Sequence, residues 1–211
     1  MRKTGVSIVV VNYNGRDLLK ALLDSICRSS YKNYKVIVVD NNSSDGSVEV
    51  IKKSYKKASI VRNKKNLGYS GINSALKFCR SDYILFLNND MELEKNSIKN
   101  LVKAISSDKS IVMAAPRLVN FYDRSLKSNG TWVSRAFYNG HLKEGNKKEI
   151  PYLGVGLIKK DFADMFGYLF DPGYFIYAED LDLGLRIRLC GKKILFEPRA
   201  LIYHMHSATT Q

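Results

Sequence analysis

The chain has 211 residues, of which 45% are apolar and 26% charged, a composition that supports a full core in one domain and excludes general disorder. Its apolar runs, such as residues 6–11, are far shorter than the roughly 20 residues that cross a bilayer. The 34 lysines and arginines outnumber the 20 acids, and the net charge of +14 favours anionic partners such as nucleic acid, a membrane surface or phosphate-bearing small molecules.

The first 115 residues alternate between strand and helix patterns. β-branched apolar runs predict strands at 6–11, 34–39, 59–62, 83–87 and 111–115. Apolar residues at helical spacing predict helices over 16–28, 47–57, around 72–79 and around 98–105. Strands that alternate with helices predict an α/β fold with a mainly parallel central sheet flanked by helices.

The pattern changes after the fifth strand. Polar, Gly- and Asn-rich residues over 117–150 predict a loop-rich excursion. Residues 181–189 alternate like a strand, yet Leu181, Leu185 and Leu189 also share one helical face, and with Asp180 as a cap we predict a helix. The remaining predicted elements are a strand at 152–158, a short helix at 160–166, and strands at 193–196 and 200–203.

Polar residues follow each of the first four predicted strands. They are residues 12–15, 40–46, 63–68 and 88–90. In an open α/β sheet ligands bind at the carboxyl ends of the strands, so these residues form the expected site. A G-x-G-x-x-G turn and a P-loop are both absent from the sequence, which disfavours a dinucleotide or P-loop protein.

Three acidic positions each have a structural and a functional interpretation. Asp40 is a turn former or helix cap, or it accepts the imide N–H of a pyrimidine that stacks on Tyr13. Asp90 is a turn residue or a ligand of a hard divalent cation whose other ligands come from a diphosphate. In the Glu179-Asp180 pair, one carboxylate is a helix cap or a general base.

Five blocks together resemble a known family. They are VSIVVVNYNG at 6–15, VVDNNSSDG at 38–46, NLGY at 66–69, LNND at 87–90 and EDLD at 179–182. Their order and spacing are similar to those of family 2 glycosyltransferases, with the rhamnosyltransferase-like branch the most similar. The resemblance runs from about residue 5 to 206.

The resemblance implies a single GT-A (Rossmann-like) domain over 1–211, in which 1–115 bind the nucleotide sugar and 116–206 bind the acceptor. It implies inverting transfer of one hexose or deoxyhexose from a UDP- or dTDP-sugar donor. The expected acceptor is a hydroxyl of a glycan or a lipid-linked molecule, in glycan or cell-envelope biosynthesis.

The resemblance also assigns residues to the donor. By position in the family's motifs, Tyr13 and Asp40 would hold the pyrimidine of the nucleotide. Asn66, Gly68 and Asn89 would line the rest of the nucleotide-sugar pocket.

Metal and catalytic roles follow from the same resemblance. Asp90 corresponds to the last acid of the family's D-x-D motif and would bind Mg²⁺ or Mn²⁺, with His204 as a second metal or diphosphate contact. Asp180 corresponds to the general base, with Glu179 as its catalytic neighbour. The first acid of D-x-D is replaced by Asn88, a neutral oxygen donor.

Two other functions stay open. A sugar-phosphate nucleotidyltransferase would share the α/β sheet and the metal, but residues 12–20 lack its Gly-rich phosphate loop. A catalytically inactive domain that binds nucleotides or anions is disfavoured because Asp40, Asp90 and the Glu179-Asp180 pair are intact. The Q-x-x-R-W motif of processive synthases is absent, which favours single-sugar addition.

Charge and cysteine content give expectations about location. We expect a cytoplasmic protein that binds peripherally to the anionic inner face of the cell membrane, with a membrane-associating segment beyond residue 211. Lys and Arg over 52–65 fit a solvated surface, and without a basic stripe interleaved with aromatics nucleic acid is disfavoured. We expect Cys27, Cys79 and Cys190 to be buried free thiols.

Overall fold

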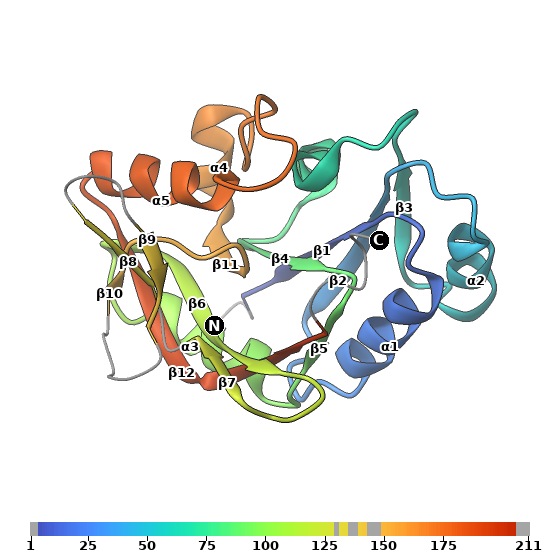
Figure 1. Ribbon diagram of the computed structural model, residues 1–211, viewed down its shortest axis with the longest axis horizontal. Helices are drawn as coiled ribbons and strands as arrows, with labels where there is room; N and C mark the ends of the chain where they lie inside the picture. Colours follow the sequence, from blue (N-terminus) through green and yellow to red (C-terminus); the bar gives the residue numbers. More distant parts are fainter. Residues whose placement is uncertain (1–3, 129–130, 135–138, 143–148, 206–211) are drawn as a thin grey trace.

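The computed structural model describes residues 4–128, 131–134, 139–142 and 149–205. Within these residues ten strands form one sheet, and its main path runs β10-β12-β6-β11-β4-β1-β2-β3 (Figure 1). The strands of this path are β1 (Val6–Asn12), β2 (Tyr34–Asp40), β3 (Ser59–Arg62), β4 (Tyr83–Asn88), β6 (Ile111–Asn120), β10 (Glu149–Ile150), β11 (Gly156–Lys159) and β12 (Lys193–His204). Two short strands extend it: β5 (Met91–Leu93) pairs with β12, and β7 (Leu126–Ser128) pairs with β6. β8 (Thr131–Val133) and β9 (Asn139–His141) form a separate pair.

Strand direction divides the sheet into two halves. β3, β2, β1 and β4 are parallel, as are β6 and β12. β11 lies between the halves and is antiparallel to both β4 and β6, so β6 runs in the same direction as β4. This confirms the predicted α/β fold with a mainly parallel central sheet, and the carboxyl ends of β1, β2 and β4 share one edge.

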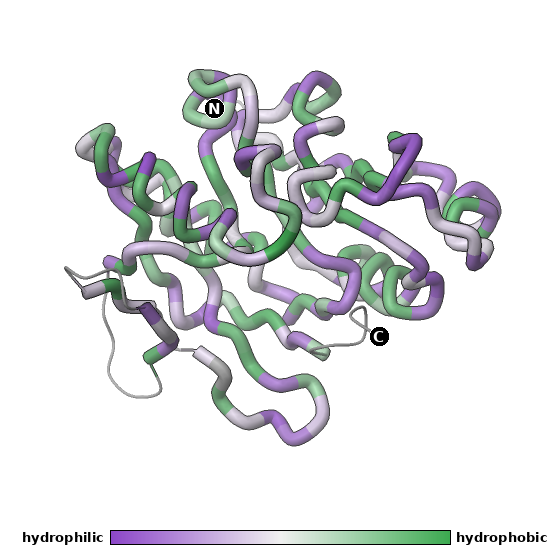
Figure 2. The backbone as a smooth tube through the Cα atoms, turned by 45° about the horizontal axis from the view of Figure 1, so that its top comes forward, coloured by the Kyte–Doolittle hydropathy of each residue, from purple (hydrophilic) through white to green (hydrophobic). Residues whose placement is uncertain are grey.

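Helices cover both faces of the sheet. In Figure 1, α4 (Lys160–Phe166), α5 (Glu179–Leu189) and the 3₁₀ helix η1 (Gly68–Phe78) lie above the sheet, and α1 (Arg16–Cys27) and α3 (Ser97–Ile105) lie below it. α2 (Ser47–Ser54) packs beside α1. Figure 2 shows apolar segments along the central strands. Every lysine and arginine of the basic run 52–65 is exposed, which agrees with a solvated surface for this run.

An aromatic cluster joins the upper layer to the sheet. The Phe170 ring stacks on Tyr69 of η1 with centroids 4.7 Å apart and meets Phe86 of β4 edge-on at 5.4 Å. Asn73 of η1 fixes the backbone of the same segment, because its Oδ1 accepts a hydrogen bond from Leu169 N at 2.8 Å. The chain leading to α5 is thereby held against η1 and β4.

The structure corrects three predicted strands. Strand β11 begins at Gly156, not at residue 152, because Tyr152 and Gly154 use their carbonyls to accept side-chain hydrogen bonds instead of ladder bonds. The two strands predicted at 193–196 and 200–203 form one strand, β12, with an irregularity between Glu197 and Leu201. The excursion over 117–150 contains the end of β6 and the short strands β7 to β10, so it holds more strand than predicted.

Smaller differences concern helices and cysteines. The helix predicted around 72–79 is a 3₁₀ helix that begins at Gly68, and the helix predicted over 47–57 ends at Ser54. All three cysteines are free, but only Cys79 is buried. Cys27 and Cys190 are exposed because they lie at the ends of α1 and α5, so their predicted burial is wrong.

A Phe170→Ala variant should lose about 3–5 kcal/mol of unfolding free energy, since it leaves a cavity between η1 and β4. Phe175→Ala is the matched control, because the Phe175 side chain is 56% exposed and its loss should cost about 0.5 kcal/mol or less. Urea denaturation of both variants measures the difference. Equal losses would show that the aromatic cluster does not hold the upper layer to the sheet.

Candidate active site

A buried asparagine joins the ends of three strands. The Asn12 side chain, at the end of β1, accepts a hydrogen bond from Asn89 Nδ2 at 2.8 Å through its Oδ1. Its Nδ2 donates to Ser43 Oγ at 3.2 Å and to Asp40 Oδ1 at 3.5 Å. Polar residues that follow β1, β2 and β4 therefore converge, as predicted.

Asp40 closes the turn that follows β2. Its side chain is inaccessible to solvent, its Oδ2 accepts the backbone N–H of Ser43 at 3.2 Å, and Arg62 Nε lies 3.5 Å from the same oxygen. Through these contacts Asp40 acts as the turn former that was one of its predicted roles. Tyr13 lies on the adjoining loop with 40% of its surface exposed, and the pyrimidine contact of both residues stays a prediction.

The end of β3 joins the network through Asn41, which sequence reasoning did not select. Asn41 Nδ2 donates to Asn66 Oδ1 at 3.2 Å and to the Gly68 carbonyl at 2.8 Å, and Asn41 Oδ1 accepts from Asn63 Nδ2 at 2.8 Å. The predicted pocket residues Asn66 and Gly68 are thus brought to the end of β2. The position of Asn41 directly after Asp40 was the available signal.

Gly68 allows the chain before α5 to reach this edge. Its φ is +61°, and a Cβ atom there would lie 1.9 Å from the Phe175 carbonyl oxygen. The same oxygen accepts the backbone N–H of Tyr69 at 3.1 Å. The segment 174–177 is therefore bound to the predicted nucleotide half by a contact that tolerates only glycine.

Asp90 and His204 come together as predicted, although they are far apart in the sequence. β12 pairs with β5, which sets His204 opposite Met91, and His204 Nε2 lies 3.2 Å from Asp90 Oδ2. The Asp90 side chain is buried, and among the described residues its Oδ1 has no hydrogen-bond partner. No group of three or more His, Cys, Asp or Glu side chains suited to a metal occurs in the described part of the chain.

The two catalytic candidates open α5. Tyr177 and Ala178, directly before them, have φ values of +69° and +66°, and Ala178 caps the helix. The Glu179 side chain is buried, and burial together with the charge of Asp180 raises its pKa. Glu179 Oε2 has no hydrogen-bond partner within the described residues.

Asp180 faces the loop before β11. A Cβ atom on Gly154 would lie 3.4 Å from Asp180 Oδ2, so the carboxylate packs against that glycine. Burial raises the pKa of Asp180, while the hydrogen bond from Leu181 N to its Oδ1 at 2.8 Å and the charge of His141 oppose the shift. A carboxylate with a raised pKa is a better proton acceptor than an exposed one.

Tyr69 relates the two groups of acids to one another. Its hydroxyl donates to the Gly154 carbonyl at 2.7 Å, beside Asp180. Burial raises the pKa of Tyr69 well above its ordinary value, and the negative charges of Glu179, Asp180 and Asp90 raise it further. The charges of all three carboxylates therefore act on one partly buried phenol, and sequence reasoning did not select Tyr69 although it ends the NLGY block.

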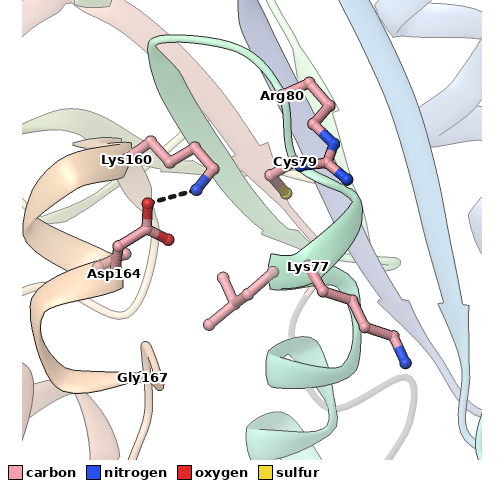
Figure 3. A pocket seen from close by; sticks show the side chains of 8 residues that line it. Lys77, Cys79, Arg80, Lys160, Asp164 and Gly167 are labelled. Carbon is pink, nitrogen blue, oxygen red and sulfur yellow. Dashed lines mark hydrogen bonds and ion pairs between the residues drawn. The ribbon is translucent and has the colours of Figure 1, made fainter.

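Cavities lined by described residues also lie outside this group of acids. One, of about 300 Å³, is lined by the loop after β1, including Asn14 and Asp17, and by Asp45. Another, of about 430 Å³, lies between η1 and α4 near the start of β4 (Figure 3). Burial raises the pKa of its Cys79 thiol to about 11, which makes this cysteine a poor nucleophile.

Comparison with known proteins identifies the class. The solved structure of GalNAc-T7 with UDP, GalNAc and Mn²⁺ matches 95% of this chain and 44% of its own, with a TM-score of 0.79 at 20% identity. The fold is therefore the GT-A fold of glycosyltransferases. Residues 7–166 match the family described as Glycosyl transferase family 2, and the chain belongs to that family.

Two relatives illustrate its place in the family. Rhamnosyltransferase WbbL of Escherichia coli K12 is 25% identical over 228 residues, covering 95% of this chain and 84% of WbbL. The UDP-Glc:alpha-D-GlcNAc-diphosphoundecaprenol beta-1,3-glucosyltransferase WfaP of Escherichia coli is 33% identical over 107 residues, which are 49% of this chain and 42% of WfaP. The predicted similarity to the rhamnosyltransferase-like branch is confirmed.

The raised pKa of Glu179 predicts a pH-dependent stability difference. The folded state holds this proton more tightly than the unfolded state, so the free energy of unfolding falls as pH rises above the ordinary value of 4.5. A Glu179→Gln variant lacks this loss, and we expect it to equal the wild type near pH 4 and to be more stable at pH 7. Urea unfolding across this range, with Glu49→Gln on the exposed side of α2 as control, measures the difference. A difference in unfolding free energy between variant and wild type that does not change with pH would contradict the raised pKa of Glu179.

Proposed function

We propose that the protein is an inverting glycosyltransferase that moves one sugar from a nucleotide-diphosphate donor to an acceptor hydroxyl. The observation that carries the proposal is that the hydrogen bond from Tyr69 to Gly154, beside Asp180, and the Gly68–Phe175 contact hold the start of α5 at the edge where the parallel strands end and Asp90 follows β4. The donor would lie over residues 1–115 and the acceptor over 116–206.

The names of similar proteins support the substrate classes. GalNAc-T7 is described with UDP, GalNAc and Mn²⁺, WbbL as a rhamnosyltransferase, and WfaP by an acceptor sugar on diphosphoundecaprenol. We propose a UDP- or dTDP-sugar donor, with a deoxyhexose as the transferred sugar favoured by WbbL. A glycan or lipid-linked acceptor in cell-envelope synthesis is proposed with it.

For the donor, the network at the strand ends offers polar groups of the required kind. Tyr13 would stack on the pyrimidine, and Asp40 would accept its imide N–H after the exposed Arg62 side chain moves aside. Asn66, Gly68 and Asn89 would line the pocket between the base and the transferred sugar.

The residues around Asp90 fit a divalent cation. The Asp90 Oδ1 atom has no partner among the described residues, Asp90 Oδ2 is close to His204, and a carboxylate oxygen is the ligand that Mg²⁺ and Mn²⁺ prefer. Asp90 and His204 would hold the ion, and the remaining ligands would come from the diphosphate. When bound, the cation would neutralise negative charge on the leaving nucleoside diphosphate.

Asp180 is the proposed general base. It would take the proton from the acceptor hydroxyl while that oxygen forms its bond to the anomeric carbon and the bond to the diphosphate oxygen breaks. The nucleoside diphosphate leaves with the electron pair, and a single displacement inverts the anomeric carbon. Burial raises the pKa of both acids, and the charge of Asp180 raises the pKa of Glu179 further.

A peripheral membrane location is part of the proposal. None of the described helices is long and apolar enough to cross a bilayer. The net charge of +14 would attract the protein to an anionic surface where a lipid-linked acceptor is found.

Asp180→Asn tests the proposed base. Transfer, or slow hydrolysis of the UDP-sugar when water is the acceptor, should fall about 10²- to 10⁴-fold because the proton acceptor is lost. Donor binding measured by calorimetry should stay within about two-fold, since the carboxylate does not touch the nucleotide. Asp161→Asn, on the exposed surface of α4, is the control that should keep full activity. Wild-type turnover by Asp180→Asn would refute the assignment.

Asp90→Ala tests the proposed metal site. Mn²⁺ should tighten the binding of UDP to the wild type and have no effect on the variant, because the ion loses its carboxylate ligand. Calorimetry with Mn²⁺ and with EDTA measures this difference. The wild type in EDTA should reproduce the variant, and a variant whose UDP affinity still responds to Mn²⁺ would place the ion elsewhere.

A further inference from the structure

Arg117 lies level with the end of β4, two strands away. Leu157 of β11 pairs with Leu85 of β4 on one side and with Ala114 of β6 on the other. Because β6 and β4 run in the same direction, Arg117, three residues after Ala114, is level with Asn88. Arg117 therefore stands at the sheet edge that carries the site.

The same register shows on which face of the sheet Arg117 lies. Gly156 is opposite Phe86, and a Cβ atom on Gly156 would lie 2.7 Å from Met113 Cε, so these three positions share one face. Side chains alternate along a strand, which puts Arg117, four residues after Met113, on that face too. This is the face against which Phe170 packs, below α5.

Arg117 keeps a buried polar atom without a partner among the described residues. Its Nε atom is buried without a hydrogen bond, and no hydrogen bond or ion pair of this side chain is found within the described residues. The other buried side-chain atoms without a partner in that part of the chain are Asp90 Oδ1 and Glu179 Oε2, both in the proposed active site. A buried polar group without a partner is unfavourable, and each one calls for an explanation in function or a bound group.

Strand spacing separates Arg117 from the donor. Neighbouring strands are about 4.8 Å apart, so β6 lies about 10 Å beyond β4 and about 19 Å beyond β2. A donor whose base is at Asp40 on β2 and whose diphosphate is at Asp90 after β4 leaves Arg117 on the far side of the transferred sugar. That side is the proposed acceptor half, where Ser128, paired with the neighbour of Arg117, contacts His141 at 3.0 Å.

We propose that Arg117 binds a phosphate or diphosphate group of the acceptor. The inference rests on the proposed glycosyltransferase function and adds the chemical class of the acceptor. A guanidinium presents five N–H donors in a planar arrangement that matches phosphate oxygens in pairs, and the Nε–H of Arg117 has no partner among the described residues.

The test measures binding of farnesyl diphosphate, and of neutral farnesol, to protein saturated with UDP and Mn²⁺. Arg117→Gln should weaken the binding of farnesyl diphosphate about ten-fold or more, and Arg117→Lys should weaken it less because one charge remains. Farnesol binding and UDP affinity should be the same in all variants. Lys53→Gln, on the exposed face of α2, removes one positive charge far from the site and should behave as the wild type.

Thermal unfolding separates this role from a structural one. Since the Arg117 side chain has no hydrogen bond or ion pair to lose within the part of the chain that the structure describes, Arg117→Gln should keep or raise the melting temperature, and a large fall would overturn the proposal. Unchanged binding of farnesyl diphosphate, an equal loss in Lys53→Gln, or a loss confined to UDP affinity would also overturn it. A wild type that binds neither UDP nor dTDP would refute the proposed function instead, and the Arg117 comparison without nucleotide would still decide this inference.

Discussion

The buried amide of Asn12 is the contact on which the architecture of the site depends. A side-chain amide removed from water must find partners for both its oxygen and its nitrogen, and Asn12 finds them on the loops after β2 and β4. The hydrogen bond from Asn89 Nδ2 to Asn12 Oδ1 fixes where Asn89 lies, and Asn89 directly precedes Asp90. The position of the proposed metal ligand therefore follows from satisfying one asparagine at the end of β1.

Much of the fold could be predicted from local patterns, since the strands and helices up to residue 115 bury faces with a clear period of two or 3.6 residues. The strand predicted at 152–158 begins only at Gly156. Tyr152 and Gly154 use their carbonyls in long-range hydrogen bonds, which the local sequence pattern does not show. The site was partly predictable for a similar reason. Motif order predicted Asp90 and Asp180 as site residues, but the positions of Asn41, Tyr69 and Arg117 beside them depend on which strands are neighbours.

The site contains several buried polar groups that are unfavourable for folding. Asp90, Glu179 and Arg117 each keep a buried polar atom without a partner in the described part of the chain, and burial opposes ionisation of the Glu179–Asp180 pair. The stability needed to hold them comes from apolar packing nearby, above all Phe170 between Tyr69 and Phe86. Substrates that carry charge would supply the missing partners, so this region should gain order when they bind.

The entry to α5 shows a further consequence of this arrangement. Tyr177 and Ala178 both adopt left-handed backbone angles, each of which costs an L-amino acid about 1–2 kcal/mol. These backbone angles turn the chain sharply enough for the next two residues to begin a helix directly over the sheet edge. Relaxing the turn would release that energy and move both acids away from Gly154. The surrounding packing therefore keeps this strained turn in place, and with it the proposed general base Asp180 beside Gly154.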